Sequence, residues 1–207
     1  HLVHMPSHIY LRTGDHADAK NSNELAIEAD RKYLQRSGST GLYPMMYYNH
    51  NIHMLAASHS NAGNYAGAVK AASDLAVNVR PNVKLMPMLE MFMPYHIEVL
   101  VRFHKWDEVL KFPQPEAEMK ITNAFWRLAR GLAFKETGKL KEADAEMTAL
   151  RGVIQTIPMD AGLGNSSAHG VMKVAEDLLA GEIALARGDK KAGIDALTRA
   201  VAAEDLV

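Results

Sequence analysis

The chain has 207 residues, 48% hydrophobic and 23% charged, which suits a globular protein with its own hydrophobic core. Its net charge is −1 and its Lys and Arg residues are scattered, so no nucleic-acid surface is expected. The absence of cysteine excludes disulfides and sulfur-ligated metal sites, and no apolar run approaches the ~20 residues that span a bilayer. We therefore expect a soluble protein without membrane insertion. Its compartment stays open, with the cytoplasm slightly favoured.

A short motif recurs five times along the chain and predicts helical hairpins. Its copies are Gly14-Asp15-His16, Gly63-Asn64-Tyr65, His104-Lys105-Trp106, Gly138-Lys139-Leu140 and Gly188-Asp189-Lys190. Each copy ends one amphipathic stretch and begins another. A small or short aliphatic residue follows three positions after each third member, at Ala19, Ala68, Val109, Ala143 and Gly193. Such spacing is typical of two antiparallel helices that approach each other closely.

Five helix pairs are predicted in chain order, over residues 6–36, 44–78, 88–112, 121–157 and 167–207. Pro6 suits the first turn of the first helix, and Asp15 is a good N-cap for its partner. The third pair is cut short by Pro113 and Pro115. The predicted fold is therefore all-α: a single domain over residues 1–207, built as a right-handed superhelical solenoid with a concave face.

This pattern resembles the tetratricopeptide repeat over nearly the whole chain, most specifically in the second and fourth pairs. The segments 1–10, 47–53 and 181–184 are similar to a bacterial group of tetratricopeptide-repeat proteins of largely unassigned function. Members of that group extend further at both ends. The resemblance therefore implies a fragment of a longer protein that binds a protein or peptide partner in its concave groove.

Candidate groove residues follow from the same spacing. Phe125, Leu128 and Leu132 share the inward stripe of the fourth pair, and Tyr47 and Tyr48 lie at the start of the second. An exposed apolar stripe at these positions would bind a peptide or partner helix, whereas a covered one would be ordinary core. An open end of the solenoid also exposes apolar surface, so a homodimer is expected.

Histidine is unusually concentrated, because eight of the ten histidines lie in the first half of the chain. His50 and His53 precede Gly63 by 13 and 10 residues, and His8 precedes Gly14 by 6. These distances differ by three and four, so the three side chains share one helical stripe when the hairpins are superimposed. His4 lies one turn before His8. We therefore expect these four imidazoles to lie close together.

Two interpretations of the four histidines stay open. Converging imidazoles suit Zn²⁺, Cu²⁺ or Ni²⁺, and three of them with an open position could form a catalytic site. Packing and ordinary hydrogen bonds are the alternative. The stripe carries no Glu base of the His-Glu-x-x-His kind, and Glu98 is the only nearby carboxylate worth naming. No catalytic residue is assigned, and an enzyme is not the favoured expectation.

Residues 86–94 hold four of the twelve methionines. Thioether sulfur is a soft ligand for Cu(I), but methionine also fills irregular gaps in cores and adaptable binding surfaces. Packing is the preferred interpretation of this segment.

Overall fold

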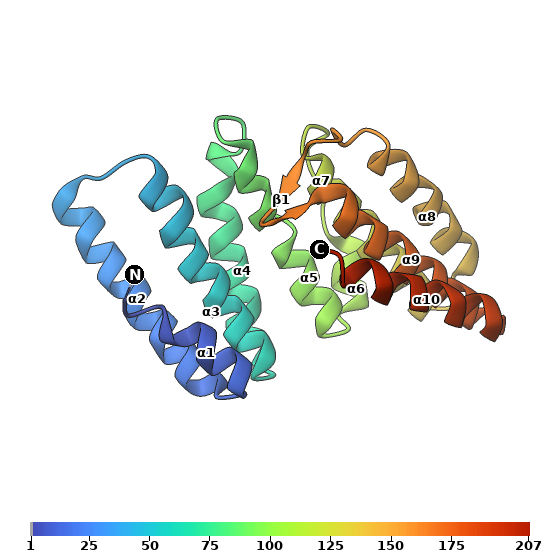
Figure 1. Ribbon diagram of the computed structural model, residues 1–207, viewed down its shortest axis with the longest axis horizontal. Helices are drawn as coiled ribbons and strands as arrows, with labels where there is room; N and C mark the ends of the chain where they lie inside the picture. Colours follow the sequence, from blue (N-terminus) through green and yellow to red (C-terminus); the bar gives the residue numbers. More distant parts are fainter. Residues whose placement is uncertain (1) are drawn as a thin grey trace. The chain divides into compact units, whose positions relative to one another are not determined.

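The computed structural model describes residues 2–207, and His1, the first residue of the family-like segment, lies outside the described residues. Ten α-helices make up most of the described chain, which confirms the all-α prediction (Figure 1). No helix in residues 2–207 is both long enough and apolar enough to cross a bilayer. The chain forms two compact units, residues 1–103 and 104–207, so the single continuous domain stays a prediction.

Unit 1 contains helices α1 to α5. They are α1 (Pro6–Thr13), α2 (His16–Ser37), α3 (Asn49–Asn61), α4 (Tyr65–Val79) and α5 (Tyr95–Arg102). Three short irregular helices join them: a π-helical η1 (Tyr43–Tyr48) and the 3₁₀-helical η2 (Arg80–Asn82) and η3 (Pro87–Phe92). One core cluster of this unit is formed by Ala56, Ala68, Ala72 and Val99, which come from α3, α4 and α5.

Unit 2 contains helices α6 to α10. They are α6 (Trp106–Lys111), α7 (Lys120–Glu136), α8 (Leu140–Ile154), α9 (Ala168–Ala186) and α10 (Lys190–Glu204). The predicted connector between α8 and α9 forms a small antiparallel ribbon of β1 (Gly162–Leu163) and β2 (Ser166–Ser167), with Gly162 opposite Ser167. The core of this unit includes Ala143, Leu150, Met172 and Leu179.

Each of the five predicted turn motifs ends one helix and begins the next. Four of them begin with a glycine in the left-handed region, namely Gly14, Gly63, Gly138 and Gly188, with φ of 85°, 72°, 75° and 85°. The third turn adopts the same conformation at His104, with φ of 55°, at a steric cost that glycine would avoid. The predicted close-contact positions Ala19, Ala68, Val109 and Ala143 are fully buried, and Gly193 is buried as well.

The predicted groove stripe of α7 is not an open surface. Phe125, Leu128 and Leu132 are half-buried and pack against the core of unit 2. A stripe that repeats every three to four residues marks the inner face of a helix, but periodicity does not tell whether that face lines a groove or a filled core. Here α8 and α9 pack against α7 and fill the space. This packing fits the alternative of ordinary core, and partner binding by these three residues stays a prediction.

Candidate metal centre

Three imidazoles meet in unit 1: His4 just before α1, His8 in α1 and His50 in α3. The Nε2 atom of His4 lies 2.9 Å from Nε2 of His8 and 3.1 Å from Nε2 of His50. One ring nitrogen from each of the three residues lies within 4.8 Å of the others, a grouping that could hold a metal ion. We call these three residues the histidine trio.

The ring of His4 meets the other two rings edge-on, whereas the rings of His8 and His50 are stacked, with centroids 5.5 Å apart and an interplanar angle of 22°. The ring centroid of His4 lies 4.7 Å from that of His8 and 4.8 Å from that of His50, and the interplanar angles are 85° and 76°. Nε2 of His4 is therefore much closer to Nε2 of His8 and of His50 than the ring centroids are to each other. Two nitrogens bound to one zinc ion at ~2.05 Å with tetrahedral angles would be ~3.3 Å apart. The spacing around His4 is within a few tenths of an ångström of that value.

A buried asparagine fixes the tautomer of His4. Oδ1 of Asn23 lies 2.7 Å from Nδ1 of His4, while Nδ2 of Asn23 donates to the backbone oxygen of Ala19 at 2.9 Å. A backbone carbonyl only accepts, so the amide group of Asn23 cannot be turned round, and its oxygen must face His4. Nδ1 of His4 is therefore the donor, and Nε2 carries the lone pair that faces the other two rings.

This arrangement matches the second layer of known metal sites, in which a ligating histidine donates its other N–H to a carbonyl or carboxylate oxygen. Ser58 extends the chain of hydrogen bonds: its Oγ accepts from Nδ2 of Asn23 at 3.3 Å and donates to the backbone oxygen of Met54 at 2.7 Å. Asn23 was not among the predicted site residues. The sequence feature that could have identified it is a short amide side chain on the face of α2 that also carries Ala19 and Ala26.

Burial favours the neutral form of His4 and His50. Desolvation lowers the pKa of His4, although its hydrogen bond to Asn23 acts in the opposite direction. Desolvation, followed by the neighbouring His4, lowers the pKa of His50 to about 4. Neutral imidazole is the form that binds metals, so at pH 7 His4 and His50 need not lose a proton before binding.

His53, the fourth predicted ligand, lies outside the trio. Its ring contacts Tyr95 at 4.3 Å and Phe92 at 5.6 Å, centroid to centroid, and burial lowers its pKa to about 4. Three residues along a helix turn the side chain by ~300°, so His53 points ~60° away from His50. That rotation places it against η3 and α5 rather than toward α1.

The trio borders a cavity of about 430 Å³ whose remaining wall is apolar. Four methionines from three segments contribute to that wall, together with two aromatic residues and a leucine: Met5, Leu42, Met46, Tyr47, Met88, Met91 and Phe92. Tyr47, predicted for a partner groove, thus faces the cavity beside the histidines. We call this space the methionine cavity. Glu98 is not part of its wall, and burial raises the pKa of that carboxyl group to about 7.

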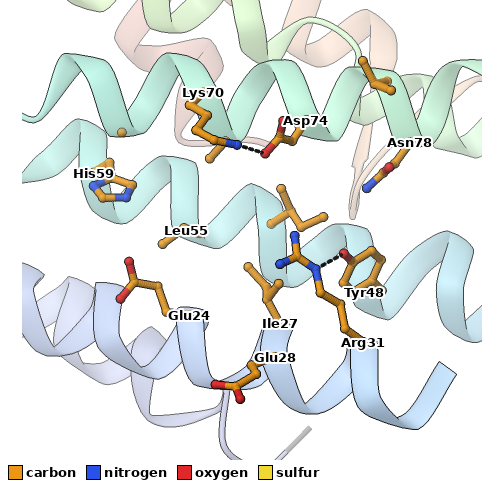
Figure 2. A pocket seen from close by; sticks show the side chains of 14 residues that line it. Glu24, Ile27, Glu28, Arg31, Tyr48, Leu55, His59, Lys70, Asp74 and Asn78 are labelled. Carbon is orange, nitrogen blue, oxygen red and sulfur yellow. Dashed lines mark hydrogen bonds and ion pairs between the residues drawn. The ribbon is translucent and has the colours of Figure 1, made fainter. Parts of the chain in front are cut away.

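A second hollow of about 550 Å³ lies along α2, α3 and α4 and is drawn in Figure 2. Two pairs of its polar side chains are joined by hydrogen bonds. Nε of Arg31 donates to the hydroxyl of Tyr48 at 3.0 Å, and Nζ of Lys70 donates to Asp74 at 2.6 Å (Figure 2). Tyr48, the other predicted groove tyrosine, therefore lines this second groove and not the methionine cavity.

Comparison of the chain with protein-family models, with curated proteins and with solved structures gave no match. The chemistry of the two hollows in unit 1 is thus the basis for any functional assignment.

Proposed function

We propose that unit 1 binds one transition-metal ion, most readily Zn²⁺, through Nε2 of His4, His8 and His50. The observation that supports this most strongly is the approach of Nε2 of His8 and Nε2 of His50 to Nε2 of His4, whose lone pair is fixed by Asn23. Without an ion, Nε2 of His4 accepts at most one good hydrogen bond from its two neighbours. The other close nitrogen pair is then left without a proton between its members, which costs free energy in a buried site.

The donor set selects the class of ion. Three imidazoles suit Zn²⁺, Cu²⁺ and Ni²⁺, whereas Ca²⁺ and Mg²⁺ prefer oxygen ligands, and the trio includes none. Three protein ligands leave a tetrahedral ion with one open position. No carboxylate lines the methionine cavity. We therefore propose a metal-binding site and assign no general base.

The test is zinc binding by the untagged protein after treatment with a chelator, measured by competition with a chromophoric chelator at pH 7. We expect one zinc ion per chain, and a loss of at least about 100-fold in affinity in His8→Ala and in His50→Ala, because each removes one of three protein ligands.

The matched control is His53→Leu. It removes a histidine of the same helix that lies outside the trio, so zinc affinity should change by less than about threefold. Equal losses in His53→Leu and His50→Ala, or unchanged affinity in both trio variants, would contradict the assignment.

A second candidate function is peptide binding in the groove of Figure 2, as the tetratricopeptide-repeat resemblance implies. The specific observation in its favour is the exposure of Val77, which is 70% exposed on the wall of this groove. An amphipathic peptide helix could cover such a surface with its apolar face. The helix pairs on either side of Gly14 and Gly63 are consistent with a repeat of this kind.

Peptide selection from a displayed library tests this second function. We expect enriched peptides with an apolar stripe, whose binding is lost in Val77→Glu and retained in Met159→Glu, a site of similar exposure in the other unit. Failure to enrich any sequence, or enrichment that Val77→Glu leaves unchanged, would argue against peptide binding in this groove.

A further inference from the structure

We propose that the methionine cavity holds a small apolar carboxylate whose anionic head completes the coordination of the ion at the histidine trio. This inference rests on the proposed metal site and adds to it the chemical class of ligand.

The size of the cavity is the first argument. A water molecule occupies ~30 Å³ in the liquid, whereas this cavity measures about 430 Å³. Cavities that bind small organic molecules span ~300–1,000 Å³. The space beside the trio thus exceeds what a fourth water ligand requires, and its volume falls within the range that holds small organic molecules.

The wall of the cavity is the second argument. Apart from the three imidazoles it is formed by Met5, Leu42, Met46, Tyr47, Met88, Met91 and Phe92, with no Asp, Glu, Lys or Arg. Methionine side chains adapt to varied apolar shapes because they are unbranched and polarizable. The body of the ligand is therefore apolar, and it carries no charge away from the ion.

Charge balance is the third argument. Three neutral imidazoles leave the full +2 charge of a divalent ion uncompensated, and neither the trio nor the cavity wall supplies a carboxylate. In a partly buried site an anion at the open position is strongly favoured over water. One carboxylate on an apolar chain satisfies both the ion and the wall.

A homologous series of ligands tests this inference on the zinc-loaded protein. Calorimetric titration with acetate, butyrate, hexanoate and octanoate should show a dissociation constant that falls about threefold to fourfold with each added methylene, since each buries apolar surface in the cavity. Octanol, which lacks the anion, should bind at least about tenfold more weakly than octanoate, and chelator-treated protein should show the same loss.

Two rim variants provide a matched pair. Leu42 is 55% exposed, so either charge is tolerated at this position with little cost to folding. Leu42→Glu should weaken octanoate binding roughly threefold through repulsion, and Leu42→Lys should leave it unchanged or strengthen it.

The outcomes separate this inference from the metal site itself. If the protein binds zinc but its affinity for the carboxylates does not depend on their chain length, the ligand class is wrong and the metal site is unaffected. This is also the result expected if a methionine sulfur fills the open position. Equal binding of octanol and octanoate would remove the role of the ion. A protein that binds no zinc would overturn both proposals.

Discussion

Replacement of Asn23 by leucine separates a metal centre from a merely packed cluster of histidines. Leucine has the same branched arrangement of heavy atoms as asparagine, with bulkier methyl groups, but it accepts no hydrogen bond, so Nδ1–H of His4 loses its partner. His4 is only 1% exposed, so water does not readily replace the lost acceptor. An unsatisfied buried N–H costs about 1–3 kcal/mol of folding free energy. The loss of a second-layer partner lowers metal affinity about 10- to 100-fold, which corresponds to roughly 1.4–2.7 kcal/mol of binding free energy.

Two measurements are needed for this variant: the free energy of unfolding by urea denaturation without metal, and zinc affinity by chelator competition. The matched control is Asn123→Leu. Asn123 is also buried, and its Nδ2 donates to the backbone oxygens of Glu116 and Met119 in unit 2. Both variants should lose stability, but only Asn23→Leu should lose zinc affinity. Equal zinc affinities in the two variants would refute the view that Asn23 orients His4 for a metal.

Three further predictions concern folding. The pKa values of His50 and His53 are about 4 in the folded chain, below the usual 6.5, so the unfolded chain binds more protons between pH 6.5 and 4. The free energy of unfolding of the metal-free protein should therefore decrease as the pH is lowered from 6.5 to 4. The decrease should be smaller in His53→Leu, and urea titrations at several pH values measure both. His104→Gly should raise the free energy of unfolding by about 0.5–1 kcal/mol, because glycine relieves the positive φ; a lower melting temperature would contradict this. Gly131→Ala should destabilise unit 2 by about 1–3 kcal/mol, since its new Cβ would lie 2.7 Å from Leu179; an unchanged denaturation midpoint would refute that packing argument.

The local features of the fold were predictable because each depends on a few neighbouring residues. A glycine at a hairpin turn and a small residue five positions later, as at Gly63 and Ala68, specify a left-handed turn and a close helix contact in almost any surroundings. The approach of His8 to His50 was predictable for a similar reason. It follows from helical periodicity and from the packing of neighbouring hairpins.

The remainder depended on contacts between distant segments. The connector after α4 folds so that Phe92 contacts His53, and Met88 lines the cavity beside His50. No periodicity in residues 80–94 specified that path. In α7 the apolar stripe could be recognised from the sequence. Its spacing, however, is the same for a helix face that lines a groove and for one that packs in a core. Leu132 is half-buried because α8 and α9 pack on that side.

X-ray absorption spectroscopy of the zinc-loaded, untagged protein tests the central claim most directly, because it reports the atoms bound to the ion. The trio predicts imidazole scattering from three nitrogen ligands at ~2.0–2.1 Å. The fourth ligand should be an oxygen atom, and its scattering should change when octanoate is added. His50→Ala should lose one imidazole. A spectrum with one imidazole or none, or one that His50→Ala leaves unaltered, would contradict the assignment of this site.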